Sequence, residues 1–362
     1  MKKVFPLLLA FLLTCPLLEA QNIKTPPASK KAAVVEYIGL TKVAVYYSRP
    51  GVKGREGKIY GKGGLVPYNG GTPFPWRAGA NENTVMYFAD DVTINGNALP
   101  AGKYGFHIIP SENEWTLIFS KDHDSWGSFF YNADNDALRV NVKPESCELT
   151  EWLSYDFVNQ TDESADIRLR WEKKQVSFTV GVDVHAVTMA GIEKSLMGLD
   201  GFNPRSYAAA AQYCLSADKD LNKALAWSDK SIDPNSGGQK TFQTLSTRYQ
   251  ILDKMGKTAE AKTAMKEALD MGNMGELHFF ARSFIQKGQP EMAMKIFKMN
   301  KERHPDDQFT TVVGMARGNM AIGEYNTAAK HFKMAAENAP PGQAGFYNNL
   351  AKQCEEKAQK GG

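Results

Sequence analysis

The sequence predicts a multidomain α+β protein, in which an antiparallel β-sandwich or barrel-like domain is followed by an all-α solenoid of helical hairpins. Three observations lead to this fold class. The 362 residues exceed what one hydrophobic core ordinarily serves. Apolar and polar residues alternate up to Asp183, as in half-buried strands, and helical spacing begins soon after it. The helical part also repeats itself at a period of about 34 residues.

Residues 1–20 have the pattern of a cleavable secretory signal. Two lysines precede an apolar run over residues 4–18, and the small residue Ala20 stands at the expected cleavage point. The run is too short to favour a membrane-spanning helix. We therefore expect a mature chain that begins at Gln21, is periplasmic or otherwise exported, and has no transmembrane segment. A lipoprotein anchored at Cys15 is the less favoured alternative, because the neighbouring residues fit a lipidation signal poorly.

Charge and cysteine content exclude some classes of protein. The chain carries 43 basic and 40 acidic side chains without a clustered basic stretch, so we expect no nucleic-acid partner. Beyond the signal, Cys147, Cys214 and Cys354 lie far apart and form no CxxC pair, which indicates neither a zinc site nor a disulfide framework. Export would permit a disulfide, and whether any of the three forms one stays open.

Residues 21–32 are polar and proline-rich, and we expect a disordered linker there, followed by a β-rich domain over 33–183. Alternation is clearest near the end of this domain, where Ile167, Leu169 and Trp171 are separated by charged residues. Further strands are expected at residues 43–47, 84–88, 102–109, 114–119, 138–143, 151–158 and 176–183, with turn signals such as Asn95-Gly96 between them. Strands without intervening helices favour an antiparallel sandwich or barrel.

Residues 48–80 form the exception within this domain. Glycine and proline are dense there and the period of two is lost. A long irregular segment inside a compact domain is more often functional or mobile than a plain connector.

Several sequence blocks of the β-rich domain occur in a fixed order. They are SRPGVKGREGKIYGKGGLVPYNG, WRAGANENT, LPAGKYGFHIIP, EWTLIFSKDHDSWG and ALRVNVKP. Together they resemble the bacterial family called domain of unknown function 2911, from about Val34 to Asp183. The chain departs from the family pattern through an insertion at 70–75 and through His107, where Phe or Thr is expected. The resemblance implies a fold and no activity, because no function is established for the family.

Helical spacing starts after Asp183. We expect a connecting helical region at 184–206, repeats at 207–342 and a capping helix with a tail at 343–362. The repeat is seen by aligning four alanines, each in the second helix of a hairpin: Ala224, Ala261, Ala293 and Ala328. Glycines five residues earlier, and small or aromatic residues at fixed offsets, resemble the tetratricopeptide family. The first copy is degenerate.

Motifs for metals and for common hydrolases are absent or incomplete. A glycine-rich stretch at 51–59 lacks the first glycine and the Ser/Thr of a phosphate-binding loop. Residues 132–143 begin like a calcium loop but have Ala137 where glycine is needed. The run Asp122-His123-Asp124 alternates sides if extended, and neither GxSxG nor HExxH occurs. We expect no metal and no cofactor.

A polar and aromatic set in the β-rich domain offers two interpretations. The residues are Arg49, Arg77, Asn81, Glu82, His107, Asp124 and Trp126. In the first interpretation the arginines grip a small anionic or carbohydrate ligand while Trp76 and Trp126 stack on it. In the second, the arginines pair with the carboxylates and tie the irregular segment to the sheet.

Three functions follow as hypotheses. In the first, the protein is an exported, non-enzymatic binding protein, whose repeats dock a protein partner and whose β-domain recognises a ligand or second partner. Exposed partner-binding candidates on the first helices of the third and fourth hairpins are His278, Arg282, Arg317 and Asn319. The alternatives are an envelope hydrolase that uses the β-domain set, and a structural spacer in a surface assembly.

Overall fold

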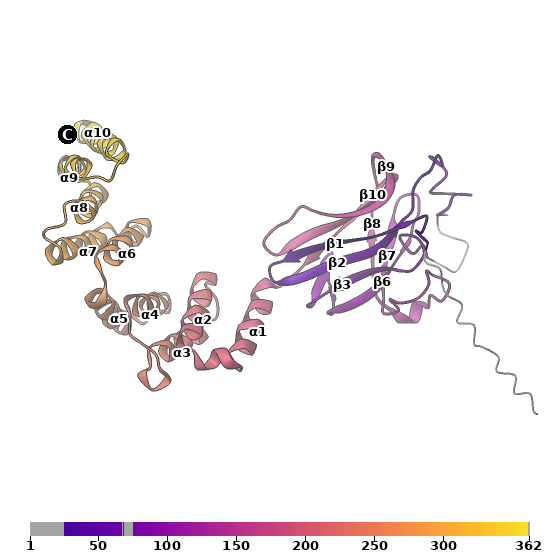
Figure 1. The fold of residues 1–362 in the computed structure, drawn as a ribbon, viewed down its shortest axis with the longest axis horizontal. Coiled ribbons are helices and arrows are strands. Elements are labelled where there is room, and N and C mark those ends of the chain that lie inside the picture. Colours follow the sequence, from indigo (N-terminus) through magenta and orange to yellow (C-terminus); the bar gives the residue numbers. More distant parts are fainter. Residues whose placement is uncertain (1–24, 67, 69–74, 361–362) are drawn as a thin grey trace, which may run out of the picture. The chain divides into compact units, whose positions relative to one another are not determined.

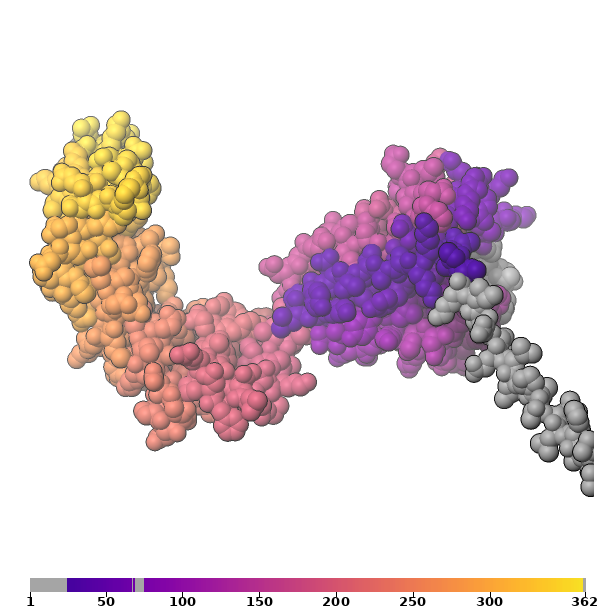
Figure 2. All heavy atoms as spheres, viewed as in Figure 1, coloured from indigo at the N-terminus to yellow at the C-terminus, as the bar shows by residue number. Residues whose placement is uncertain are grey.

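The computed structural model describes residues 25–66, 68 and 75–360 (Figure 1). The expected signal peptide, Cys15 and the first residues of the expected linker lie outside this part. The chain divides into two compact units, Met1–Thr188 and Met189–Gly362. Figure 2 shows both units with all atoms. Within the described residues, no helix combines the length and apolar character needed to cross a bilayer.

Two antiparallel sheets build the β-domain, which confirms the expected sandwich. The larger sheet has the strand order β1-β2-β3-β6-β7-β8, and the smaller sheet the order β5-β4-β10-β9. The larger sheet comprises β1 (Lys30–Ile38), β2 (Thr41–Arg49), β3 (Thr84–Phe88), β6 (Gly102–Ile109), β7 (Trp115–Ser120) and β8 (Asp136–Val142). The smaller comprises β4 (Val92–Ile94), β5 (Asn97–Leu99), β9 (Glu145–Val158) and β10 (Ser164–Gly181).

The expected linker ends earlier than its composition suggested. Strand β1 begins at Lys30, which pairs with Arg49 of β2, so residues 30–32 belong to the sheet and not to a disordered segment. The two lysines made this stretch look polar and linker-like. In the strand their side chains are exposed, and the alternation of the following residues continues without a break.

One hydrophobic core lies between the two sheets. Inward residues of β10, such as Ile167 and Leu169, meet inward residues of β6 and β7. The rings of Phe106, Phe119 and Phe178 contact one another at centroid distances of 5.2–5.7 Å. Burying each such side chain contributes about 1.5–3 kcal/mol, so the period-two pattern of the sequence supplies most of the driving force for this unit.

The described residues between β2 and β3 are irregular, as expected, and are tied to the sandwich at a few points. Isolated bridges join Gly51 to Trp152 and Trp76 to Ile108. Glu172 interrupts the ladder between β9 and β10 with a φ of 55°. From this bulge its carboxylate accepts a hydrogen bond from the backbone N–H of Gly57, at 2.9 Å. The bulge thereby aims a charged side chain at a loop that has no ladder of its own.

The second unit is a succession of helical hairpins (Figure 1). A connecting region holds α1 (Val184–Leu196) and a 3-10 turn at Leu199–Phe202. The hairpins are α2 (Pro204–Ala217) with α3 (Leu221–Ile232), α4 (Phe242–Lys254) with α5 (Thr258–Met271), α6 (Met274–Gln286) with α7 (Pro290–Arg303), and α8 (Thr310–Ala321) with α9 (Tyr325–Glu337). Helix α10 (Ala344–Lys360) packs on α9 as the expected cap.

The positions that revealed the repeat are packing positions. The four aligned alanines are all buried, and each sits where its helix contacts its hairpin partner. Gly256, Gly288 and Gly323 adopt φ values of 71–86° in the turns, which other residues reach only with strain. In α8, a Cβ at position 314 would lie 2.6 Å from Cδ1 of Phe297, so glycine lets α8 approach the preceding hairpin.

The apolar core of this unit is divided into three clusters of buried side chains. The first joins α2 and α3 to Met189 and Ile251. The second spans α4 to α7. The third joins α8 and α9 to α10. A stack in which each hairpin touches mainly its neighbours produces this subdivision.

Candidate functional site

The candidate residues expected in the β-domain do not converge on one cavity. Nε of Arg49 donates to the carbonyl oxygen of Leu153 at 2.7 Å. Nδ2 of Asn81 donates to the carbonyl oxygen of Ser29 at 3.3 Å, and Glu82 forms an ion pair with Lys31 at 2.8 Å. The Arg49 contact joins β2 to β9 of the opposite sheet, and the Asn81 and Glu82 contacts tie a loop to the start of β1.

Arg77 and His107 lie together in a second place. Nη1 of Arg77 donates to the carbonyl oxygen of Asn81, and its guanidinium lies 5.4 Å from the ring centre of Phe129. His107 is buried against Ser128, with 2.9 Å between its Nδ1 and the Ser128 Oγ. Burial, and then the nearby Arg77 charge, lower the pKa of His107 to about 4.

Arginine therefore does structural work here, but not with the partners that the sequence suggested. The acceptors for Arg49 and Arg77 are backbone carbonyls, so the expected pairing with Glu82 and Asp124 is wrong. Every residue has a backbone carbonyl, so the sequence gives no indication of which carbonyl an arginine will bind. The acceptors of Arg49 and Arg77 could therefore not be predicted. His107 takes the place of the Phe or Thr that the family resemblance implies, and it packs there as a neutral ring.

The aromatic residues of the set also separate. Trp76, expected to stack on a ligand, packs instead against Trp171, with 5.9 Å between ring centres, and against Tyr60. Trp126 is 55% exposed on the loop between β7 and β8. Asp124 of the same loop is exposed and lines a cleft on the larger sheet.

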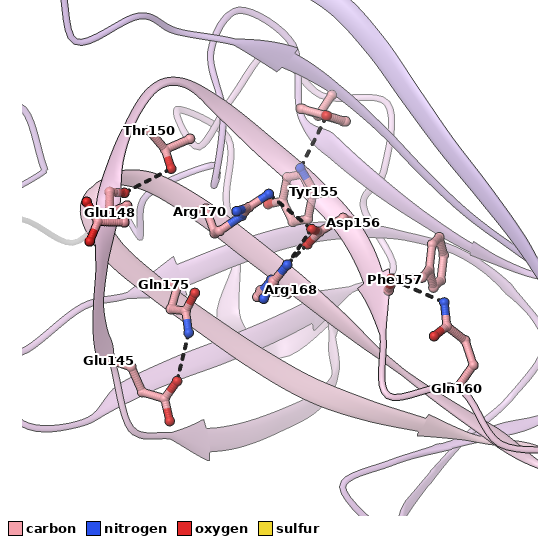
Figure 3. Close-up of polar contacts among 11 residues, drawn as sticks. Glu145, Glu148, Thr150, Tyr155, Asp156, Phe157, Gln160, Arg168, Arg170 and Gln175 are labelled. Carbon is pink, nitrogen blue, oxygen red and sulfur yellow. Dashed lines mark hydrogen bonds and ion pairs between the residues drawn. The ribbon is translucent and has the colours of Figure 1, made fainter.

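The outer face of the smaller sheet holds a polar cluster that sequence reasoning did not single out (Figure 3). Arg168 binds both carboxylate oxygens of Asp156, at 3.0 and 2.6 Å, and Arg170 adds a contact at 3.1 Å. The pattern of alternation placed these residues outward but gave no pairing. Because the carboxylate of Asp156 accepts hydrogen bonds from two guanidinium groups on the neighbouring strand, the cluster links β9 to β10.

In the helical unit, two of the four expected partner-binding residues are not exposed. His278 is only 6% exposed, because α8 packs beside α6 with Gly314 close to the imidazole. Asn319 is buried as well, and its Nδ2 donates to the carbonyl oxygen of Met315 one turn earlier. The prediction that these two side chains are exposed is wrong.

The two arginines remain, and the structure brings them to one place. Arg282 on α6 and Arg317 on α8 both lie near His278. Burial, and then the Arg282 charge, lower the pKa of Arg317. Burial, and then the charges of Arg282 and Arg317, lower the pKa of His278 to about 4. These α6 and α8 side chains, together with Phe279, are called the arginine groove below.

Polar atoms in the arginine groove lack partners. Nε of Arg317 and Nδ1 of His278 are buried without a hydrogen bond. Neither arginine forms an ion pair with any residue in the described part of the chain. Phe279 stands beside them with 66% of its surface exposed, and the Arg282 guanidinium lies 5.7 Å from its ring centre. A buried donor without an acceptor costs about 1–3 kcal/mol, so an anionic ligand gains by supplying one.

These features define a two-unit protein, a β-sandwich followed by tetratricopeptide-like hairpins. Comparison with known proteins adds the family. Residues 29–180 match the family model described as protein of unknown function DUF2911, so the β-domain is a DUF2911 domain, as its sequence blocks implied.

Two solved structures resemble part of the chain. A mutant of MamA is 12% identical and has a TM-score of 0.28, over 43% of this chain and 85% of that one. YrrB, described as a TPR protein with an unusual peptide-binding site, is 19% identical and has a TM-score of 0.26, over 46% of this chain and 90% of that one. The comparison with curated protein sequences gave no match.

Proposed function

We propose that this is a non-enzymatic binding protein whose helical repeats dock a protein segment that carries a carboxylate. One observation carries the proposal. Two arginines on the first helices of consecutive hairpins lie near a buried, neutral histidine, and neither arginine forms an ion pair with an acidic side chain of the described residues. Stacked hairpins present extended surfaces suited to such docking.

The chemistry of the arginine groove selects the kind of segment. A guanidinium binds carboxylate bidentately, and it does so more strongly when it is partly desolvated, as Arg317 is. Phe279 offers an exposed ring next to Arg282, on which an apolar side chain of the same segment can pack. An acidic residue, or a chain end, next to an apolar residue therefore matches the groove.

Peptide binding by the mature chain, residues 21–362, tests this proposal. Peptides with randomised last four positions and a free C-terminus are compared with the same peptides as C-terminal amides by fluorescence anisotropy. Arg282→Gln with Arg317→Gln should weaken the best binders about tenfold or more, as loss of charge-assisted hydrogen bonds does. Lys262→Gln with Lys266→Gln removes the same charge from exposed positions of α5 and serves as the matched control.

Equal binding by wild type and the arginine variant would favour the spacer hypothesis for the helical unit. The hydrolase hypothesis has no specific support, because its residue set is spread over separate structural contacts. The β-domain contributes the second half of the proposed function, recognition of a ligand.

Export belongs to the proposal as well. It rests on the lysines, the apolar run and Ala20 at the start of the sequence. N-terminal sequencing of the mature protein should begin at Gln21. A lipidated N-terminus at Cys15 would replace free export by membrane anchoring.

A further inference from the structure

A cleft lies on the larger sheet of the β-domain, on the face turned away from the core. It is lined by two lysines, two tyrosines and three further residues: Lys42, Tyr46, Val85, Tyr87, Lys103, His123 and Asp124. Its volume is about 530 Å³. Sites for small ligands span about 300–1,000 Å³, so the cleft has room for a short oligosaccharide.

The strand register builds the walls of this sheet-face cleft. On β2, β3 and β6 the side chains that point away from the core come from alternate residues. Tyr46 of β2 lies opposite Val85 of β3, and Tyr87 of β3 lies opposite both Ala44 of β2 and Lys103 of β6.

The loop after β7 closes one side of the cleft, and it is anchored there. Asn83 donates to the backbone carbonyl of Asp122 at 3.2 Å, and Asn135 donates to its carboxylate at 2.7 Å. Gly105 of β6 has no room for a Cβ because the same carbonyl presses on it. These contacts fix Asp122, so the next two residues, His123 and Asp124, are held at the rim.

Polar groups that line the cleft are uncommitted. The side chains of Lys42, Lys103, Tyr46, Tyr87, His123 and Asp124 form no hydrogen bond or ion pair with another described residue. On the smaller sheet, by contrast, Arg168 is paired with Asp156. A concave surface that combines flat rings with free donors and acceptors is typical of a site for a hydroxyl-rich ligand.

Charge decides between a neutral and an acidic ligand. Two lysine ammonium groups and one aspartate carboxylate line the cleft, so these three side chains together carry a net positive charge. An anionic lipid surface is disfavoured, since the loop that carries the exposed Trp126 also carries Asp122, Asp124 and Asp134. A sugar with a carboxylate satisfies both the rings and the lysines.

We propose that the sheet-face cleft binds an acidic saccharide, with Tyr46 and Tyr87 stacked on sugar rings and Lys42 and Lys103 contacting the carboxylates. The inference rests on the β-domain half of the proposed function and names its ligand class. It is independent of the arginine groove, so the two can fail separately.

Calorimetry with the mature chain tests the inference with three acidic oligosaccharides that differ in ring configuration: oligogalacturonate, oligomannuronate and oligoguluronate. Methyl-esterified oligogalacturonate, polyglutamate and phosphatidylglycerol vesicles are the comparison probes. At least one acidic saccharide should bind, with affinity that falls as salt rises, and neither the ester nor polyglutamate should match it. Tyr46→Ala with Tyr87→Ala should weaken binding about tenfold or more.

Matched variants separate the cleft from its surroundings. Lys42→Gln with Lys103→Gln should weaken the acidic saccharide and leave the ester unchanged. Tyr37→Ala, exposed on the neighbouring strand β1, and Lys143→Gln at the end of β8 should bind like wild type. Melting curves establish that each variant is folded, and Arg282→Gln with Arg317→Gln should bind saccharide normally.

Three results would overturn the inference. The first is that none of the three acidic saccharides binds. The second is that polyglutamate or vesicles bind as tightly as the saccharides, and the third is that the folded tyrosine variant still binds saccharide. Peptide binding at the arginine groove would be unaffected by each of these results, so the proposed function of the repeats would stand.

Discussion

Each unit of this protein buries one histidine beside arginine, and the two arginine environments differ in the hydrogen-bond acceptors that they supply. In the β-domain, burial and Arg77 lower the pKa of His107 to about 4. In the helical unit, burial and two arginines lower the pKa of His278 to about 4. The Arg77 guanidinium has a backbone carbonyl as acceptor and the Phe129 ring beside it, whereas Nε of Arg317 is buried with no acceptor.

A structural arginine differs from an available one in the acceptors around its guanidinium group. Both arginines lie beside a buried histidine, so this feature does not distinguish a structural arginine from an available one. What distinguishes them is whether the fold supplies acceptors for the guanidinium. Arg77 is held by its own domain, whereas Nε of Arg317 has no acceptor among the described residues.

The largest expected effect concerns neither arginine but the packing beneath the helical surface. Phe332→Ala should lower the free energy of unfolding of the helical unit by about 3–5 kcal/mol, because the ring is fully buried in the last cluster. Denaturant unfolding followed by far-ultraviolet circular dichroism measures it. Phe346→Ala, at a half-exposed ring of α10, is the control and should stay near wild type. Equal effects would mean that the last hairpin is not packed as described.

Replacing Arg77 and Arg317 should have opposite effects on stability. Arg77→Met should destabilise the β-domain by about 1.5–3 kcal/mol, because it removes a charged hydrogen bond to the carbonyl of Asn81. Arg317→Met should leave the helical unit unchanged or more stable, because it removes a donor that has no acceptor. Thermal unfolding of the two variants is compared. If Arg317→Met destabilises the helical unit as much as Arg77→Met destabilises the β-domain, both arginines are structural.

Burial of His107 should make the stability of the β-domain depend on pH. An unfolded histidine has a pKa of about 6.5, whereas folded His107 has a pKa of about 4, so the unfolded state takes up its proton first. The stabilisation is complete above pH about 6.5 and is lost as the pH falls toward 4. His107→Phe should flatten this part of the unfolding profile of the β-domain. A profile that keeps its slope in this variant would assign the acid sensitivity to other groups.

For His278 the sign of the shift is the same, but a ligand should change it. A carboxylate bound at Arg282 and Arg317 offsets two charges that hold the pKa of His278 down, so the pKa should rise. Proton NMR of the imidazole, with and without the best peptide from the anisotropy screen, measures this. No change on saturation would place the peptide elsewhere on the helical unit.

The smallest expected effect is on the stability of the arginine-groove variant. Arg282→Gln with Arg317→Gln should alter the free energy of unfolding by no more than about 0.5 kcal/mol, because neither guanidinium forms an ion pair with another described residue. A loss well above this value would show that the arginines hold α6 to α8 and would weaken the argument for an open binding surface.

Periodicity explains what the sequence could predict. Alternation such as Ile167, Leu169 and Trp171 fixes which face of a strand is buried, and the aligned alanines fix which face of a helix meets its partner. Both are local signals. The fold class and the order of the units follow from them without knowledge of distant contacts.

Burial by a neighbouring hairpin has no such signal. His278 lies next to the packing residue Leu277, and it is enclosed by the Phe297 ring of α7 and by the close approach of Gly314 on α8. In the β-domain, the partners of Arg49 and Asn81 are backbone carbonyls far along the chain, and irregular segments offer no period from which to find them. The sheet-face cleft was missed except for Asp124, because it needs the register of three strands.

The divided core of the helical unit gives the arginine groove one more property. Core residues of α6 belong to the middle cluster and those of α8 to the last one, so Arg282 and Arg317 stand on opposite sides of a seam. Sub-global opening in repeat arrays takes place at such seams, and it exposes backbone amides to exchange. A segment bound to both arginines would hold α6 and α8 together across this boundary. It would therefore slow amide exchange in α8, α9 and α10 together. Docking would thus set how long the end of the array stays closed.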